Sequence, residues 1–448
     1  MSDDVLLSAW KKTVRQYRSR TAVGECATGK RVTFQELDDR ASAWLPAQGI
    51  ATADLLGQPV VYSTANGIGW LEIFLGLLKA RAVIVPVDAA EPKEAQRRIA
   101  DAVRARFWWD GTRLIPLPKK PGHSHKNAIC LIKLTSGTTG APRALSFTSA
   151  QLFADAAQIT ATMGIIPRDL NYALIPLGHS YGLGNLTLPL LVKGVPLVCG
   201  TSPLPHAIAA DFEKWKPTVF PGVPAMWRAL STSDVILKSL RLGISAGAVL
   251  PPSVAQEFHA RHGIRLHNFY GSSETGGIAY DKNGHATLSG GVGRALRGVV
   301  LRTIKSSQLE VSSAAVFTHR NRRRNRSQHG VWRTSDLVKL DSRGELTLLG
   351  RQGQTVKIAG RRVNLSEVLA RLRAIPSVTD AWVGINNESD PALGAVVATT
   401  LGVTHLRTAL HVDTAPWKIP KKWMIVPSLP LTARGKPDTR AMQGMIGG

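Results

Sequence analysis

The chain of 448 residues is poor in cysteine and contains no long apolar run. Its three cysteines, Cys26, Cys130 and Cys199, lack the spacing of a metal site or a disulfide framework, so we expect reduced core thiols in a cytoplasmic protein. No apolar stretch reaches the length of a membrane span. Residues 1–4 lack the basic and apolar segments of a secretory signal, and we expect none.

The length exceeds what one hydrophobic core usually serves, so we expect at least two domains. Apolar strand-like runs alternate with helical stretches, which indicates an α/β architecture. These runs are residues 82–87, 171–175, 218–220 and 240–245. Thr33 and Glu36 form a capping box for a helix that begins near Phe34 and that Pro46 should kink or end.

A loop rich in hydroxyl groups, residues 135–143, reads Thr-Ser-Gly-Thr-Thr-Gly-Ala-Pro-Arg. Hydroxyls and glycine N–H groups can donate to phosphate oxygens, and the arginine neutralises charge. An apolar run at 128–134 precedes the loop, and a helical pattern at 149–164 follows, with Thr148 and Gln151 as a capping box. The sequence therefore predicts a strand, a phosphate loop and a helix. It is not a Walker loop, because no Gly-Lys-Ser/Thr follows the glycines.

The order of residues in this loop resembles the signature of the adenylate-forming (AMP-binding) superfamily, which includes acyl-CoA synthetases and aryl- or fatty-acid:thiol ligases. Further segments resemble the family's later motifs in the right order. They are residues 268–274, 332–336, 350–367 and 429–436. The chain has Ala144 and Ser335 where the family usually has glycine, and Gly353 where it usually has aspartate or lysine.

The resemblance implies an α/β fold with a large N-terminal domain of layered α/β subdomains and a small mobile C-terminal α+β domain. The N-terminal adenylation domain, residues 1–350, would bind ATP and the acid. Residues 351–353 would form a hinge, and residues 354–448 a lid. Gly353 permits wide backbone rotation in that hinge.

The resemblance also implies that ATP activates a carboxylic acid to an acyl-adenylate, with release of pyrophosphate. Two anions must meet in this step, so cations and fixed donors are needed where charge builds. Glu274 would ligate Mg²⁺ and Ser273 would reach the α-phosphate, while Lys436 would bridge that phosphate and the carboxylate. The loop residues implied to hold the other phosphates are Thr135, Ser136, Gly137, Thr138, Thr139, Gly140 and Arg143.

The remaining nucleotide contacts come from scattered positions. Tyr270 would lie against the adenine beside Gly271, and Gly247 would allow a close backbone approach. Asp336 would accept hydrogen bonds from the ribose hydroxyls. Arg351 would contact the ribose or the α-phosphate.

The acid is expected beside residues 178–182, Gly-His-Ser-Tyr-Gly. Members that activate amino acids usually carry an aspartate there, whereas this chain has His179 and Ser180, which favours an aryl or fatty acid without an α-amine. A packed core histidine is the alternative for His179. Gly276 and Gly277 are expected to leave space for a ring or chain.

The acceptor would be the pantetheine thiol of coenzyme A or of a carrier protein acting in trans. The net charge of +25 and the five arginines in residues 319–326 suit an acidic carrier protein or coenzyme A phosphates, although a solvated loop is the simpler interpretation. No aromatic residues interleave those arginines, so nucleic acid is not an expected partner. An amino-acid adenylation enzyme and a catalytically impaired binding protein of the same fold remain alternatives.

Overall fold

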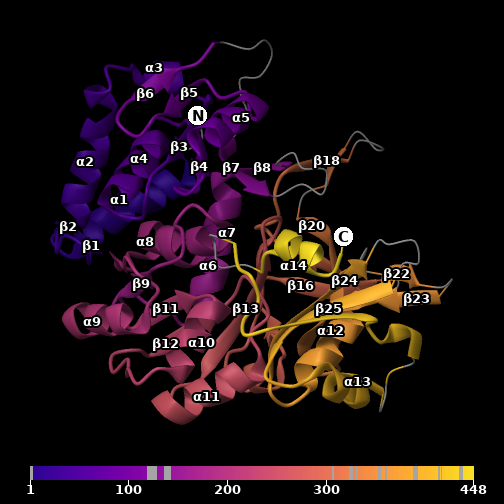
Figure 1. The fold of residues 1–448 in the computed structure, drawn as a ribbon. Coiled ribbons are helices and arrows are strands. Elements are labelled where there is room, and N and C mark those ends of the chain that lie inside the picture. The colour runs from indigo at the N-terminus through magenta and orange to yellow at the C-terminus, as the bar shows by residue number, and fades with distance from the viewer. Residues whose placement is uncertain are drawn as a thin grey trace.

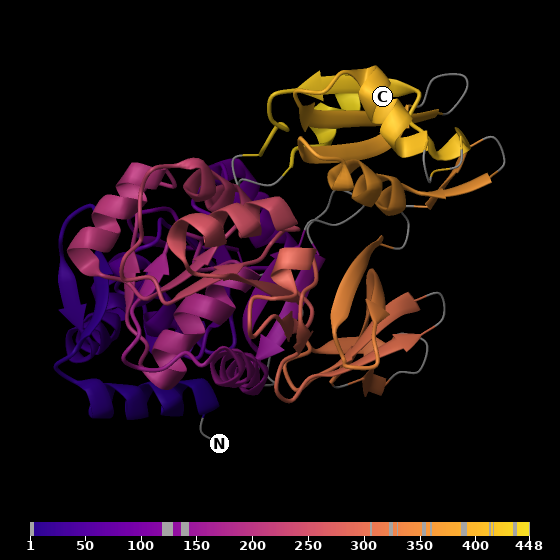
Figure 2. The same cartoon turned by 90° about the horizontal axis from the view of Figure 1, so that it is seen from below.

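The structure is a computed structural model that describes residues 4–118, 129–135, 143–304, 307–321, 326–328, 330–351, 355–358, 361–386, 392–411, 414, 416–432 and 437–447. It confirms the α/β class, with a large N-terminal domain and a smaller C-terminal domain of sheet and helices (Figures 1 and 2). The smaller domain, in yellow and light orange, lies to one side of the large one in Figure 2.

A nine-stranded sheet forms the largest layer of the N-terminal domain. In sheet order its strands are β15 (Arg294–Ala295), β14 (Gly276–Tyr280), β13 (Leu266–Ser272), β12 (Leu242–Ser245), β11 (Val219–Gly222), β9 (Asn171–Ala173), β10 (Leu197–Cys199), β1 (Thr21–Glu25) and β2 (Arg31–Thr33). Its central strands, from β13 to β1, pair in parallel. The strand expectations at 171–175, 218–220 and 240–245 correspond to β9, β11 and β12.

A six-stranded sheet and a four-stranded sheet complete the large domain. The six strands are β6 (Leu114–Pro116), β5 (Phe107–Trp109), β3 (Pro59–Ser63), β4 (Val83–Val87), β7 (Ile129–Thr135) and β8 (Arg143–Thr148). The four are β16 (Val300–Ile304), β17 (Gln308–Ser312), β20 (Val331–Leu340) and β21 (Leu346–Arg351). A small hairpin joins β18 (His319–Asn321) to β19 (Arg326–Gln328).

Helices separate these strands along the chain (Figure 1). They are α1 (Val5–Tyr17), α2 (Phe34–Ala47), α3 (Thr52–Leu55), α4 (Ile68–Lys79), α5 (Lys93–Ala102), α6 (Ser149–Met163), α7 (Ser180–Gly182), the π-helix η1 (Leu183–Thr187), α8 (Leu188–Lys193), α9 (Pro205–Trp215), α10 (Pro224–Thr232), α11 (Pro252–His262) and the 3₁₀-helix η2 (Thr287–Ser289). The capping boxes expected for α2 and α6 are both present, and α2 ends at Ala47, directly after Pro46.

The prediction of strand, loop and helix at the hydroxyl-rich loop is wrong in one respect. A second strand, β8, follows the loop and pairs antiparallel with β7 before α6 begins. Leu145 and Phe147 of β8 are buried, because alternate side chains of the added strand face the core. Thr135 and Arg143 therefore lie opposite each other at the ends of two antiparallel strands.

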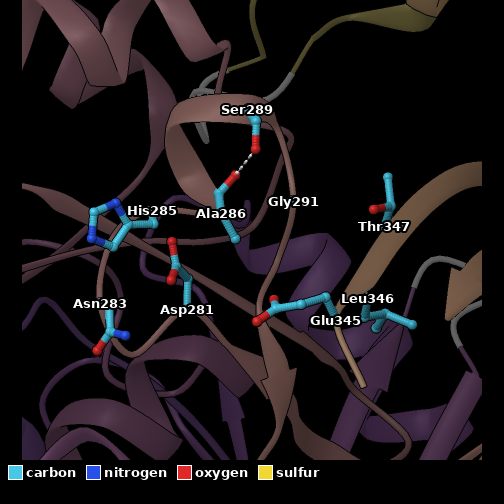
Figure 3. A pocket seen from close by; sticks show the side chains of 9 residues that line it. All are labelled: Asp281, Asn283, His285, Ala286, Ser289, Gly291, Glu345, Leu346 and Thr347. Atoms are coloured by element: carbon cyan, nitrogen blue, oxygen red, sulfur yellow. Dashed lines mark hydrogen bonds between the residues drawn. The ribbon is translucent and has the colours of Figure 1, made fainter. Parts of the chain in front are cut away.

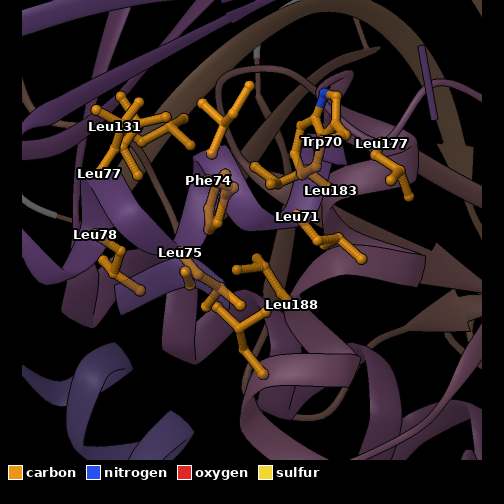
Figure 4. Packing of buried hydrophobic residues seen from close by; sticks show 14 of the residues in the cluster. Trp70, Leu71, Phe74, Leu75, Leu77, Leu78, Leu131, Leu177, Leu183 and Leu188 are labelled. Atoms are coloured by element: carbon orange, nitrogen blue, oxygen red, sulfur yellow. The ribbon is translucent and has the colours of Figure 1, made fainter. Parts of the chain in front are cut away.

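The core beneath this hairpin is apolar on the side of α4. Trp70 and Phe74 stack with ring centroids 5.3 Å apart, and Leu131 of β7 belongs to the same buried cluster (Figure 4). Leu131 is fully buried. This packing fixes the base of the hairpin against the interior of the domain.

The C-terminal domain is built on a three-stranded sheet of β24 (Val378–Asn386), β25 (Ala392–Thr399) and β26 (Lys422–Val426). The hairpin β22 (Thr355–Ile358) and β23 (Arg361–Asn364), the helices α12 (Leu365–Ala374), α13 (Val403–His411) and α14 (Thr439–Met445), and the 3₁₀-helix η4 (Pro416–Lys418) accompany it. Arg228 of α10 donates to the carbonyl of Thr379 and lies 3.5 Å from the Asp380 carboxylate, which links the two domains.

Candidate active site

The hydroxyl-rich hairpin closes at the cross-strand pair Thr135 and Arg143. The intervening candidates Ser136, Gly137, Thr138, Thr139 and Gly140 lie outside the described residues. The Arg143 guanidinium lies over two rings, 5.6 Å from the centroid of Phe317 and 5.2 Å from that of Trp332. An aromatic face holds a cation without consuming its hydrogen-bond donors, so Arg143 can still serve a phosphate.

Glu274 follows β13 in the turn that leads to β14, and its backbone carbonyl accepts a hydrogen bond from the N–H of Phe317. This bond brings Glu274 next to the ring on which Arg143 rests. Among the described residues, the negative charge of Glu274 acts on the cations of Lys133 and Arg351, as expected for a carboxylate in a site that holds cations.

The described residues contain no group of three or more His, Cys, Asp or Glu side chains that could hold a metal. An ion bound at Glu274 would therefore take most of its ligands from water and from phosphate oxygens. This donor set fits Mg²⁺, which usually keeps several waters and binds one or two carboxylates.

Tyr270, Asp336 and Arg351 form a hydrogen-bonded group between the nine-stranded and four-stranded sheets. The Tyr270 hydroxyl donates to Asp336 Oδ2 over 2.5 Å, and Arg351 Nε donates to Asp336 Oδ1 over 2.7 Å. Asp336 and Arg351 are directly paired residues of β20 and β21. Burial, and then the neighbouring Asp336 charge, raise the pKa of Tyr270 far above its usual value, so the phenol keeps its proton and donates it.

Each Asp336 oxygen has one of these partners, and a carboxylate oxygen can accept more than one hydrogen bond. The carboxylate can therefore still accept from ribose hydroxyls. The side chain of Asp336 is only 8% exposed, whereas that of Arg351 is 63% exposed and can turn toward a ligand. Gly271 follows Tyr270 in β13.

The small-residue turn follows β12, with Gly247 at a φ of +87°. Glycine adopts this left-handed conformation without steric cost. Tyr181 donates from its hydroxyl to the carbonyl of Ile244, 3.1 Å away, and so connects the segment of residues 178–182 to the end of β12. The two candidate walls of the site are thus in contact.

His179 is not a packed core histidine. Its side chain is 36% exposed, and Nε2 lies 3.2 Å from a carboxylate oxygen of Asp88. The next residue, Ser180, donates from Oγ to Oγ of Ser273 over 3.1 Å. The structure therefore brings His179, Ser180 and the motif of Ser273 and Glu274 together.

Gly276 and Gly277 do not leave open space at the positions that their Cβ atoms would take, so the expectation is wrong for that side of each residue. Gly276 has a φ of +70°, and a Cβ there would overlap the Asp155 carboxylate. A Cβ on Gly277 would lie 2.6 Å from Leu296. The glycines admit these neighbouring side chains, and Asp155 Oδ1 accepts the N–H of Gly277 over 2.9 Å.

Two expected elements of the site, Lys436 and the hinge residue Gly353, lie outside the described residues. Sequence reasoning also missed Lys133, Asp155 and Asp88. The sequence does mark Lys133 and Asp155 as unusual. Lys133 interrupts an apolar strand, and Asp155 interrupts the apolar face of a helix.

A pocket of about 350 Å³ opens near β14 and β21 and is lined by residues that include Asp281, His285 and Glu345 (Figure 3). Another of about 560 Å³ lies between α5 and β5, beside Trp108. Neither is lined by any of the predicted site residues that the structure describes.

The three cysteines are free, and Cys130 and Cys199 are buried while Cys26 is partly exposed. Burial raises the pKa of Cys199 to about 12, so this thiol stays protonated near neutral pH.

Among the helices that the structure describes, none has the length and apolar character to cross a membrane.

Known proteins match both the sequence and the fold. The chain is 28% identical over 338 residues to benzoate–CoA ligase of Thauera aromatica, a match that covers 68% of this chain and 64% of that protein. It is 25% identical to anthranilate–CoA ligase of Pseudomonas aeruginosa, over 69% of this chain and 65% of that protein. The chain thus spans slightly less than two thirds of each relative.

The crystal structure of ATP-bound MatB from Rhodopseudomonas palustris superposes with a TM-score of 0.81 at 21% identity, over 98% of each chain. This similarity concerns the fold. The sequence model described as AMP-binding enzyme matches residues 10–110 and 107–313, which is well over half of the chain. The chain therefore belongs to the AMP-binding enzyme family.

Proposed function

We propose that the chain is an acid–thiol ligase that uses ATP to convert a carboxylic acid to an acyl-adenylate. Pyrophosphate leaves, and the acyl group then passes to the pantetheine thiol of coenzyme A or of a carrier protein. The observation that carries the proposal is two sets of contacts, one that connects Arg143 through Phe317 to Glu274 and one that connects Tyr270 to Asp336. These side chains supply a cation, a carboxylate, an aromatic ring and a hydrogen-bond acceptor.

In this proposal the hairpin of residues 135–143 holds the phosphates, and Arg143 reduces the repulsion between the two reacting anions. Asp336 orients the ribose, with Tyr270 and Arg351 fixing its carboxylate, and Gly247 lets the backbone approach the adenine. Ser273 faces the α-phosphate. When bound, Mg²⁺ would neutralise phosphate charge, and Glu274 would hold it.

Lys436 carries the adenylation step in this proposal. Its ammonium would bridge the α-phosphate and the substrate carboxylate once the C-terminal domain, residues 354–448, closes over the site about a hinge at 351–353. A flexible lysine side chain suits such a reach. Closure and reopening would separate adenylation from thiol transfer.

The substrate we propose is an aryl or fatty acid without an α-amine. Support comes from residues 178–182, where the chain has His179 and Ser180 and no aspartate, while the nearby Asp88 carboxylate is paired with His179 Nε2 over 3.2 Å. The names of the two relatives, which are ligases for benzoate and anthranilate, favour the aryl class. An amino-acid adenylation enzyme that loads a carrier in trans is the second candidate, and the basic segment of residues 319–326 would suit an acidic carrier protein.

Isotope exchange between ATP and pyrophosphate tests the proposal directly. The assay uses a panel of aryl, fatty and amino acids, and coenzyme A is added to each positive reaction afterwards. We expect exchange with aryl or fatty acids and thioester formation with coenzyme A. Exchange with amino acids alone would favour the second candidate, and nucleotide binding without exchange would indicate a catalytically impaired binding protein.

A further inference from the structure

Asp88 directly follows β4, at the carboxyl edge of the six-stranded sheet, and lies beside the segment of residues 178–182. Its side chain is only 10% exposed, and Oδ2 lies 3.2 Å from His179 Nε2. Oδ1 accepts the backbone N–H of Ala90 over 2.9 Å. The two oxygens of this carboxylate therefore face different groups, one in the loop of Asp88 itself and one in the expected acid site.

The contact with Asp88 determines how the His179 ring is held. An ionised carboxylate only accepts hydrogen bonds, so Nε2 carries the proton between the two groups, and Nδ1 remains on the other side of the ring. The side chain of His179 is 36% exposed, so part of the ring is accessible to a ligand. A fixed partner reduces the conformational entropy that such a side chain loses when a ligand binds.

The backbone before His179 is held by other contacts. The Asn66 amide donates to the carbonyl of Ile175 over 2.9 Å and accepts the N–H of Leu177 over 3.0 Å. Both bonds are independent of Asp88. Loss of the Asp88 charge should therefore release the imidazole without releasing the segment that carries it.

Three consecutive side chains of this segment contact residues at the carboxyl ends of three strands. His179 contacts the aspartate that follows β4. Ser180 donates from Oγ to Ser273, which follows β13, and the Tyr181 hydroxyl donates to the carbonyl of Ile244 near the end of β12. In open α/β sheets ligands bind in the crevice outside the carboxyl ends of the strands, so the His179 ring stands at the position expected for a substrate contact.

We propose that Asp88 is a positioning residue that orients the His179 imidazole for binding of the carboxylic acid. The inference rests on the proposed function, in which residues 178–182 lie beside the acid. Asp88 acts through the ring and does not touch the substrate. Without its charge the ring samples several rotamers, and a bound acid has to select one of them at an entropic cost. The effect should therefore appear in binding of the acid and not in binding of ATP.

The test measures exchange between ATP and pyrophosphate by the full chain with the most active acid of the panel, starting with benzoate. Asp88→Ser keeps an acceptor for the Ala90 N–H, but its hydroxyl is too short to reach His179. We expect the KM for the acid to rise roughly 10-fold, as for a lost contact to a charged group at a partly exposed site, while the KM for ATP changes less than about 2-fold.

Asp110→Ser is the matched control. Asp110 Oδ1 also accepts the backbone N–H of the residue two positions later, Thr112, over 2.8 Å. It follows β5 and lines the pocket beside Trp108, away from the predicted site residues. Both KM values should therefore stay at the wild-type level in this variant.

The variant His179→Gln tests whether Asp88 acts through the ring. The double variant Asp88→Ser/His179→Gln should raise the KM for the acid no further than His179→Gln alone, because the group that Asp88 positions is already absent. Thermal unfolding verifies that each variant is folded, and Asp88→Asn, which keeps the size of the side chain and should also raise the KM, replaces Asp88→Ser if the latter is not.

An unchanged KM for the acid in the folded Asp88 variant would overturn the inference. So would an equal rise in the KM for ATP, or independent losses that add up in the double variant. Absence of exchange by the wild-type chain with every aryl and fatty acid would instead contradict the proposed function.

Discussion

Tyr270 of β13 donates a 2.5 Å hydrogen bond to Asp336 of β20 and thereby ties the nine-stranded sheet to the four-stranded sheet. Both side chains are buried. The bond therefore gives the buried Tyr270 hydroxyl a hydrogen-bond acceptor. It also fixes the carboxylate that we assign to the ribose.

Tyr270→Phe should weaken both stability and nucleotide binding. Loss of a hydrogen bond to a charged group costs about 1.5–3 kcal/mol in free energy of unfolding. Denaturant unfolding and the KM for ATP in pyrophosphate exchange measure the two effects. Tyr280→Phe, at a buried tyrosine of β14, is the matched control and should leave the KM for ATP unchanged. Equal effects of both substitutions on that KM would argue against the role of Tyr270.

Gly276→Ala should be severely destabilising. For a residue with a Cβ, the left-handed conformation at a φ of +70° costs about 1–2 kcal/mol, and the Cβ would also collide with Asp155. Gly69→Ala in α4 is the control, because nothing lies within 4 Å of the place that its Cβ would take and alanine favours helix. Thermal unfolding compares the two, and a Gly276→Ala protein as stable as Gly69→Ala would contradict the packing described.

Lys436→Ala should abolish acyl-adenylate formation and leave thioester formation from a supplied acyl-adenylate largely intact. Loss of a donor that stabilises the transition state typically lowers the rate by about 10²–10³-fold. Pyrophosphate exchange measures the first half-reaction, and thioester release measures the second. Arg407→Ala removes an exposed cation of the same domain and should affect neither. A similar loss in both half-reactions would refute the assignment of Lys436.

Gly353→Pro should slow thiol transfer more than adenylation. Proline fixes φ near −65°, and a hinge must change its backbone angles between two orientations. Gly353→Ala keeps most of that freedom and should have a smaller effect. Rapid-quench measurement of both half-reactions distinguishes the effects of the two substitutions. Unchanged transfer kinetics in Gly353→Pro would place the hinge elsewhere.

Local signals in the sequence were sufficient to predict where helices α2 and α6 begin. The capping boxes at Thr33 and Thr148 involve residues three positions apart, so the sequence alone contains all their partners. Strand β8 was missed although Leu145 and Phe147 alternate with less buried residues, because a short alternating run beside a loop is ambiguous until its partner strand is known.

The residues of the candidate site also divide into those that the sequence identifies and those that only the structure identifies. The motif residues Tyr270, Glu274 and Asp336 were found from their order in the chain. Lys133 and Asp155 were not, because their burial depends on how β7 and α6 pack in the domain core. An isolated charge in an apolar pattern marks an unusual position, but only the tertiary structure shows its neighbours, such as the Gly277 N–H that donates to Asp155.

The contact between Arg228 and Asp380 has a consequence for experiments on domain closure. It is an ion pair between domains whose charged atoms are 3.5 Å apart, with the two side chains 32% and 17% exposed. Salt screens such a close, partly buried pair only weakly, because the Debye length is about 8 Å at 0.15 M ionic strength. If the lid swings as proposed, a substitution of Arg228 is therefore a better means than added salt to release this contact.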